Sequence, residues 1–217
     1  QGERHGVGIE HLPPSSWNAR RDLSSAIRAR QGHAGQARVS RSPAGMKRRR
    51  VKITGIGPVT PAGIGREAFW RGIQEPVSRV RPFTKLGDEY GPFVAAHVPH
   101  FDIRKYVDET KLPKGSARHT LFAVAASILA LEDAGISLDE LQHLSCAVVS
   151  GSSLLDFGGI GAAIDSVQRR GARGAQPRVV YTTTLSVIPE VISDICRISA
   201  RTMSVQTSCC SGLDAIG

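Results

Sequence analysis

The chain has 217 residues, of which 28 are Lys or Arg and 19 are Asp or Glu, so its formal net charge is +9. Its 41% hydrophobic content and four cysteines exclude a wholly disordered chain, a collagen-like repeat and a disulfide-stapled secreted scaffold. No apolar run approaches the ~20 residues of a membrane-spanning helix, and no signal-peptide core follows the N-terminus. We therefore expect one ordinary domain with reduced thiols and a cytoplasmic location.

The positive charge is concentrated in residues 1–50. This segment holds 11 Lys or Arg and three acidic residues, a net of +8, whereas the rest of the chain is nearly neutral. Because it is rich in Gly, Ser, Pro and Arg and has few periodic apolar residues, we expect residues 1–47 to be a disordered basic leader or an artefactual upstream extension. The first methionine is Met46, which we expect to be the natural start. An organellar transit peptide and a nucleic-acid-binding arm are the alternative interpretations.

The first part of the body alternates between strand-like and helix-like patterns. Residues 51–57 predict a short buried strand that ends in a glycine turn. Residues 65–73 predict a helix with Phe69, Trp70 and Ile73 on one face, and an irregular proline-rich stretch follows, with a short strand near residues 93–98. The apolar spacing of residues 116–134 predicts a helix that Gly135 ends.

The second part continues the alternation. Residues 146–151 and 203–207 predict buried strands, and residues 160–170 and 188–198 predict helices, the latter with Pro189 in its first turn. Strands that alternate with helices indicate an α/β layered fold with a largely parallel sheet. The last predicted helix begins near Leu213, and Gly217 lies inside it. We therefore expect a domain that is truncated at its C-terminal end.

A cysteine stands at the turn between the last predicted strand and the last predicted helix. There, the thiol of Cys209 would project from the sheet edge, and the first N–H groups of the helix would favour a thiolate and could bind a developing oxyanion. This placement predicts a nucleophile. The alternative is an inert buried thiol, because free cysteine is among the most buried residue types.

The residues around Cys209 resemble the active-site segment of a known family. Residues 205–217 read Val-Gln-Thr-Ser-Cys-Cys-Ser-Gly-Leu-Asp-Ala-Ile-Gly and are similar to that segment in the β-ketoacyl-acyl-carrier-protein synthases. Three further stretches resemble the family in the right order: residues 51–63, the markers at residues 81–83 and 101–102, and the helix that ends Leu-Glu-Asp-Ala-Gly at residues 131–135. The resemblance, to KAS II-like ketosynthases, covers residues 48–217, the N-terminal half of such an enzyme.

The resemblance implies the N-terminal half of a thiolase-like fold with α-β-α-β-α layers and a homodimer when full length. We expect no cofactor, and no zinc site because Cys146 and Cys196 are isolated, without C-x-x-C or histidine spacing. The resemblance also implies a condensing acyltransferase of fatty-acid or polyketide biosynthesis. An acyl chain moves from acyl carrier protein onto the cysteine, and malonyl-carrier protein then decarboxylates to a carbanion that attacks the new thioester. By this resemblance Cys209 is the nucleophile, and its backbone N–H is one donor of the oxyanion hole.

Other residues receive weaker interpretations. Residues 151–154 resemble the family's Gly-Ser-Gly-Ile segment, whose apolar member lies beside the acyl pocket, so Leu154 is a candidate for sensing chain length or, equally, for core packing. Lys111, Lys114 and Arg118 could attract an acidic carrier protein, although a solvated helix start would look the same. The family completes its site with two histidines and a lysine from its second half, and no histidine here can be matched to them. We therefore expect His97, His100, His119 and His143 to be surface or loop residues, and the chain alone to lack condensing activity.

Two alternatives remain open within this resemblance. The chain could be a non-catalytic partner subunit that shapes chain length in a ketosynthase heterodimer. Such partners usually carry Gln or another residue at the nucleophile position, so Cys209 favours the enzyme. The other alternative is a thiolase-fold enzyme that condenses coenzyme A thioesters, which the strand-turn-helix residues fit less well.

Overall fold

A computed structural model describes residues 50–83, 91–98, 100–154 and 156–217. The predicted leader at residues 1–47 and the position of Met46 lie outside the described residues. The chain divides into a unit Gln1–Val51 and a unit Lys52–Gly217, and only the second is described below. Among the described residues, every helix is too short or too polar to cross a membrane.

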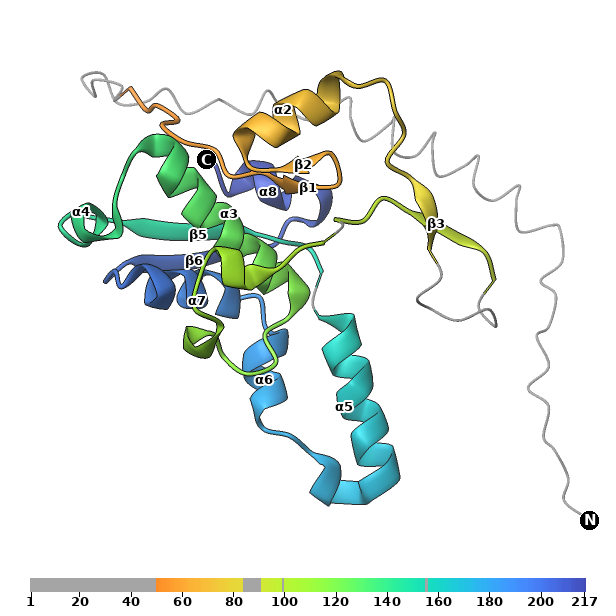
Figure 1. The fold of residues 1–217 in the computed structure, drawn as a ribbon. Helices are drawn as coiled ribbons and strands as arrows, with labels where there is room; N and C mark the ends of the chain where they lie inside the picture. Colours follow the sequence, from red (N-terminus) through yellow and green to blue (C-terminus); the bar gives the residue numbers. More distant parts are fainter. Residues whose placement is uncertain (1–49, 84–90, 99, 155) are drawn as a thin grey trace, which may run out of the picture. The chain divides into compact units, whose positions relative to one another are not determined.

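Two parallel strands carry the site. β5 (Ala147–Gly151) and β6 (Arg201–Val205) pair in register from Ala147 opposite Arg201 to Gly151 opposite Val205 (Figure 1). Between them the chain forms α5 (Phe157–Arg170), the 3-10 turn η5 (Gly171–Gly174), α6 (Arg178–Thr183) and α7 (Val187–Cys196). Parallel neighbours require such a helical crossover, because a tight turn cannot join them. The predicted alternation of strands and helices is confirmed here.

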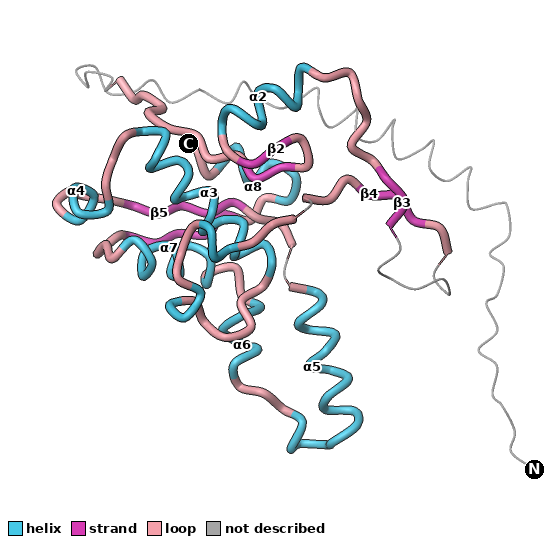
Figure 2. The backbone as a smooth tube through the Cα atoms, in the orientation of Figure 1, coloured by secondary structure: helices cyan, strands magenta, loops and turns pink. Residues whose placement is uncertain are grey.

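The core lies where α3 (Arg118–Ala134) packs on α7 and α7 packs on the two strands (Figure 2). Its buried members come mostly from α7: Val124, Val187, Ile188, Val191, Ile192 and Cys196. The alternation of β5 turns Val148 toward this cluster and leaves Val149 40% exposed. The prediction of fully buried strands is therefore wrong for β5 and β6, which the described helices cover on one face.

The helix α3 is the element that the sequence predicts best. It ends at Gly135, which adopts a left-handed conformation with φ 67°. The N–H of Gly135 donates to the carbonyl of Glu132, and the N–H of Ile136 donates to the carbonyl of Leu131. These two bonds are the Schellman arrangement, which satisfies carbonyls at a helix end.

Apolar periodicity does not indicate the short helix that follows α3. α4 (Leu138–Gln142) begins with a capping box in which the Ser137 hydroxyl accepts from the Glu140 N–H, while the Glu140 carboxylate accepts from Ser137. These hydrogen bonds from the backbone and hydroxyl of Ser137 hold the pKa of Glu140 below its ordinary value. The Ser-x-x-Glu spacing is a recognised start signal and could have predicted this helix.

The N-terminal segment differs from its prediction. Residues 52–57 form no strand, and Ile53 is 78% exposed. The segment instead runs along α3: the N–H of Ile56 donates to the Asp133 carboxylate at 3.0 Å, and a Cβ on Gly57 would lie 1.9 Å from the carbonyl oxygen of Ala126. Within the described residues, no neighbouring strand pairs with this segment, so it keeps an extended path without a ladder.

Small elements complete the described unit. β1 (Val59–Thr60) and β2 (Gly63–Ile64) form a hairpin before α2 (Arg66–Gln74), the helix predicted for residues 65–73. Its expected apolar face is not buried, since Trp70 and Ile73 are exposed. β3 (Arg81–Phe83) pairs antiparallel with β4 (Phe93–Ala95), which confirms the strand predicted near residues 93–98. Two 3-10 turns, η3 (Ile103–Lys105) and η4 (Glu109–Lys111), lead to α3.

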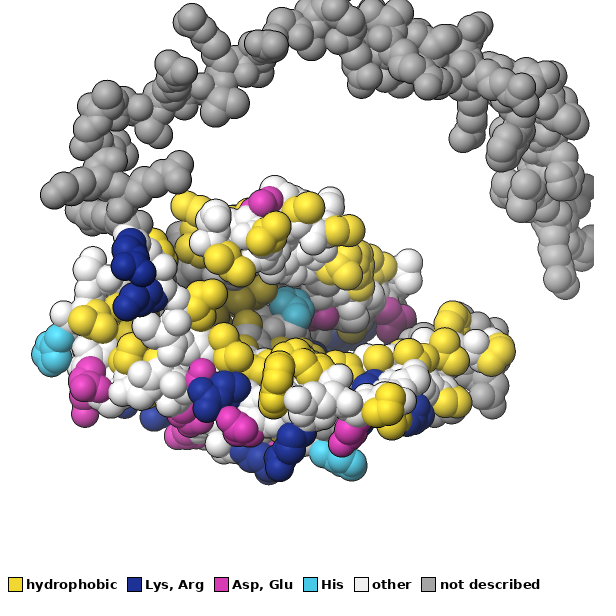
Figure 3. Space-filling view, turned by 90° about the horizontal axis from the view of Figure 1, so that it is seen from above, with side chains coloured by type: hydrophobic (Ala, Val, Ile, Leu, Met, Phe, Trp, Pro, Cys, Tyr) yellow, Lys and Arg dark blue, Asp and Glu magenta, His cyan; other side chains and the backbone are white. Residues whose placement is uncertain are grey.

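The described unit exposes many large hydrophobic side chains. Figure 3 shows them spread over one face and gathered around a hollow near its middle. The most exposed come from several parts of the unit: Ile53, Val94, Leu154, Phe157, Tyr181, Leu213 and Ile216. Apolar surface of this extent is typical of proteins that bind a partner or a ligand there.

Candidate active site

The two parallel strands deliver their following loops to one edge. The pairing continues past β5, because the N–H of Ser152 donates to the carbonyl of Val205 at 3.2 Å. The Gln206 side-chain amide then donates to the carbonyl of Ser153 at 3.4 Å. The loops after β5 and β6 therefore lie side by side at the carboxyl ends of the strands, where α/β sheets bind their ligands.

The turn after β6 is sharp and internally bonded. Ser208 takes the left-handed region with φ 54°, and the 3-10 turn η6 (Ser208–Cys210) leads directly into α8 (Ser211–Asp214). A non-glycine residue in that region costs about 1–2 kcal/mol, so the bend needs support. The buried Ser211 hydroxyl supplies it: it accepts from the N–H of Thr207 at 2.9 Å and donates to the carbonyl of Ser208 at 2.7 Å.

Replacing Ser211 with alanine is expected to lower the free energy of unfolding by about 1–3 kcal/mol, because the partly buried hydrogen bond from the N–H of Thr207 would lose its acceptor. Urea denaturation measures the change. Ser186→Ala is the matched control, since Ser186 is exposed and its hydroxyl meets only that of Thr184, at 3.3 Å. Equal losses in the two variants would show that Ser211 does not hold the turn.

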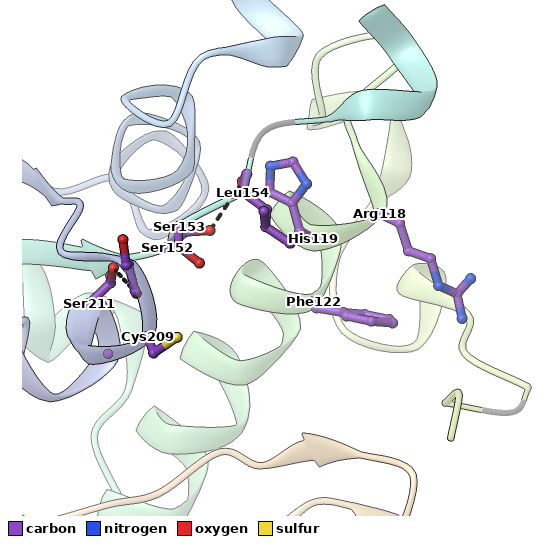
Figure 4. Close-up of a pocket in the computed structure, with 11 residues that line it drawn as sticks. Arg118, His119, Phe122, Ser152, Ser153, Leu154, Cys209 and Ser211 are labelled. Carbon is purple, nitrogen blue, oxygen red and sulfur yellow. Dashed lines mark hydrogen bonds between the residues drawn. The ribbon is translucent and has the colours of Figure 1, made fainter. Parts of the chain in front are cut away.

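Cys209 is exposed and lines a cavity of about 630 Å³. In Figure 4 its side chain lies on one side of this space, and side chains of α3, among them His119 and Phe122, lie on the other. The wall comes from three places: the start of α3, the loop after β5 and the turn after β6. The lining residues are Arg118, His119, Phe122, Gly151, Ser152, Ser153, Leu154, Ser208, Cys209, Ser211 and Gly212. The thiol is thus reachable by a ligand of moderate size.

Leu154 lines the same cavity and is 62% exposed. The structure thus brings together the two site residues that the sequence singled out. Such exposure does not fit the alternative in which Leu154 is a packed core residue. Its contact with an acyl chain stays a prediction.

The histidine expectations hold for three residues and are wrong for His119. His97, His100 and His143 are exposed, and His97 meets Phe83 edge-on at 6.1 Å between ring centroids. His119 instead lies in the first turn of α3, is partly buried and lines the cavity with Cys209. The helix itself was predicted, but nothing in its periodicity shows that its N-terminal end reaches the carboxyl edge of the sheet.

Arg118 is held by its neighbours. Its guanidinium donates to the carbonyl of Val98 at 3.0 Å and lies 4.8 Å from the ring centroid of Phe122, a cation–π contact. These contacts hold Arg118 at the cavity wall. Lys111, Lys114 and Arg118 are all exposed, so each of the three cations considered for carrier docking is accessible.

The remaining cysteines differ from Cys209 in exposure. Cys196 is buried in the core, and burial raises the pKa of its thiol. Cys146 is partly buried, whereas Cys210 is as open as its neighbour Cys209. Across the part of the chain that the structure describes, no group of three or more His, Cys, Asp or Glu side chains could hold a metal ion.

A family model described as "Beta-ketoacyl synthase, N-terminal domain" matches residues 48–217. The chain belongs to the β-ketoacyl synthase family. It is 26% identical over 176 residues to 3-oxoacyl-[acyl-carrier-protein] synthase 2 of Vibrio harveyi, and the aligned region covers 79% of this chain and 41% of that protein. It is 35% identical over 114 residues to the putative polyketide β-ketoacyl synthase 2 of Streptomyces halstedii, covering 51% of this chain and 27% of that protein.

A solved structure supports the same fold. The ishigamide ketosynthase/chain length factor superimposes with a TM-score of 0.66 at 24% identity and covers 76% of this chain and 43% of that one. The fold is therefore that of the thiolase-like ketosynthases, as the sequence resemblance implied, and the chain supplies its N-terminal part. This β-ketoacyl synthase chain spans less than half the length of each of these relatives.

Proposed function

We propose that the chain is the nucleophile-bearing part of a condensing acyltransferase, a 3-oxoacyl-[acyl-carrier-protein] synthase of fatty-acid or polyketide biosynthesis. One observation carries the proposal: the thiol of Cys209 stands exposed at the bend after β6 and lines a cavity. Family membership supports it, since both curated relatives are named as synthases of this kind.

In the proposed first stage, Cys209 takes the acyl group from a carrier-protein thioester. Its thiolate attacks the carbonyl carbon, a new carbon–sulfur bond forms, and the bond to the carrier sulfur breaks. The carrier thiolate leaves and receives the proton that Cys209 gave up. The backbone N–H of Cys209 is the proposed donor to the oxyanion that forms in between.

The proposed second stage joins two carbons. Malonyl-carrier protein loses CO₂, and the resulting carbanion attacks the acyl group on Cys209, which releases the thiolate again. The resemblance assigns stabilisation of that carbanion to residues that this chain does not match. We therefore retain the expectation that the chain alone lacks condensing activity.

The proposed partner is an acyl carrier protein, because the Vibrio harveyi relative is named for one. Lys111 and Lys114 are exposed in the segment that leads into α3, and positive side chains there would attract an acidic carrier. A homodimer of the full-length protein and a cytoplasmic location stay predictions.

A chain-length partner subunit is the second candidate, since the ishigamide structure is named for both a ketosynthase and a chain length factor. The nucleophile position separates the two. Cys209 carries an accessible thiol at that position, which a partner without transfer chemistry does not need.

Acyl transfer from a small thioester tests the proposal. Incubation with hexanoyl-N-acetylcysteamine is expected to add one hexanoyl group to the protein, and peptide mapping by mass spectrometry is expected to place it on Cys209. Cys209→Ala should lose the modification completely. Cys210→Ala is the matched control, because Cys210 is the adjacent exposed thiol, and it should keep the modification.

The thiols of Cys146 and Cys196 define the result that would contradict the proposal. Cys196 is 2% exposed and its pKa is raised by burial, so it should react slowest. Modification confined to Cys146 or Cys196, or equal loss in the two alanine variants, would contradict the assignment of Cys209.

A further inference from the structure

Two adjacent thiols are exposed at the turn after β6, and only one of them lines the cavity. Cys209 forms part of the cavity wall, as do Ser208 and Ser211, whereas Cys210 does not belong to the described lining. In Figure 4 the Cys209 side chain lies beside the space in front of α3. Successive residues of a 3-10 turn point about a third of a turn apart. The rotation of η6 therefore decides which thiol meets a substrate.

A hydrogen bond between two side chains ties the beginning of this turn to its end. The Thr207 hydroxyl donates to the Asp214 carboxylate at 2.5 Å. Thr207 precedes η6 and Asp214 is the last residue of α8, so the bond closes a loop that contains both cysteines. Hydrogen bonds to an ionised acceptor are about twice as strong as those between neutral groups. Because both residues are exposed and water could serve either of them, the bond fixes geometry rather than satisfying a buried group.

The turn would relax if this tie were lost. Ser208 takes the left-handed region with φ 54°, which strains a residue other than glycine. The N–H of Cys210 donates to the Thr207 carbonyl at 3.2 Å, and the Ser211 hydroxyl accepts from the Thr207 N–H. These bonds meet at Thr207, so they hold the turn in one rotation only while Thr207 itself is held. Among the described residues, Asp214 is the partner of the Thr207 side chain.

We propose that Asp214 is a positioning residue for acyl transfer. Acting through Thr207, its carboxylate holds η6 in the rotation that presents Cys209 to the cavity and keeps Cys210 out of it. The inference rests on the proposed function, because it takes acyl transfer to one of two neighbouring thiols as the event that needs selection. Asp214 takes no part in the bond changes, and its effect is on the orientation of the thiol.

Paired variants of the tie test the inference on the whole chain. Asp214→Ala removes the acceptor, and Thr207→Val removes the donor with a side chain of nearly the same shape. In each, hexanoyl transfer from hexanoyl-N-acetylcysteamine to Cys209 is expected to be about tenfold slower, and part of the hexanoyl is expected on Cys210. Fragment-ion mass spectrometry separates the adjacent residues and gives both readouts. A mere loss of stability would not move the hexanoyl to the neighbouring thiol, and it would expose Cys196 to the reagent.

Conservative variants assign the effect to the hydrogen bond. Thr207→Ser keeps the hydroxyl and should restore the wild-type rate and site. Asp214→Asn keeps a carbonyl oxygen as a neutral acceptor and should give an intermediate rate. The double variant Thr207→Val/Asp214→Ala should be no slower than either single variant, because both changes remove the same bond. Thr202→Val and Asp194→Ala are the matched controls, since both residues are exposed and neither side chain has a hydrogen bond in the described structure.

Amide hydrogen exchange reads the turn without acyl transfer. The Cys210 N–H should exchange about tenfold faster in Asp214→Ala and in Thr207→Val, which corresponds to about 1.4 kcal/mol of local opening. The Ile136 N–H at the end of α3 is the internal control and should not change. Unchanged exchange at Cys210, or wild-type acylation in both variants, would overturn the inference and leave the proposed function intact. If the wild type transfers no acyl group, the proposed function fails, and the exchange rates alone decide the inference.

Discussion

Gly151→Ala is expected to destabilise the protein and to displace the turn that carries Cys209. Gly151 ends β5, and a Cβ built there would lie 2.1 Å from the carbonyl oxygen of Ser211 and 2.5 Å from its carbonyl carbon. Both are backbone atoms, which cannot rotate away as the end of a flexible side chain can. The strand or the turn must move, and such overpacking costs about 1–3 kcal/mol or more. Urea denaturation measures the loss.

A second readout separates displacement of the turn from loss of stability alone. The rate at which an alkylating reagent modifies Cys209 should change in Gly151→Ala at urea concentrations where the variant is still folded. Gly161→Ala is the matched control, because Gly161 lies inside α5 with no atom within 4 Å of an added Cβ. It should gain up to about 1 kcal/mol, since alanine favours a helix interior over glycine. If Gly151→Ala matches the wild type in both readouts, the strand end and the turn are not in contact.

The bend at Cys209 could be predicted from sequence because its cause is local. A strand, small residues and a helix start follow one another within residues 201–214, and the structure has them in that order. The support of the bend was not predictable. Ser211 is one small residue among several in the segment, and only the fold shows its hydroxyl bonded to Thr207 and Ser208.

The cavity could be predicted only in part. Cys209 and Leu154 both follow predicted strands, and parallel strands bring their carboxyl ends to one edge. His119 belongs to a helix whose position over that edge depends on long-range packing of α3 on α7. Apolar spacing in residues 116–134 identifies the helix but does not say which sheet edge its first turn meets.

Burial was the least predictable property. Residues 51–57 and β5 have apolar runs typical of elements covered on two faces, and the strand at residues 203–207 is also predicted to be buried. In the structure Ile53 and Met203 are 78% and 59% exposed, because no described element packs over them. A hydrophobic run indicates that a surface needs cover, and it does not indicate which segment supplies that cover.

Ile192→Ala is expected to produce the second large loss of stability. Ile192 is 8% exposed on α7 and belongs to the cluster with Val124 of α3 and Cys196. Truncating a buried isoleucine to alanine removes transfer free energy and leaves a cavity, which together cost about 2–5 kcal/mol. The same cluster joins α3 to the strands through Val148, so a weakened core also weakens the frame that holds the start of α3 opposite Cys209.

Ile164→Ala is the matched control for that core. Ile164 is the same residue type on α5 but is 54% exposed, so its truncation should change the free energy of unfolding by no more than about 0.5 kcal/mol. Urea denaturation of both variants gives the difference. If Ile192→Ala loses about 2 kcal/mol or more beyond the loss in Ile164→Ala, then α3, α7 and β5 form their core in this chain by itself. Equal values would mean that the cluster is not packed in solution, and the cavity beside Cys209 would then lack a fixed wall.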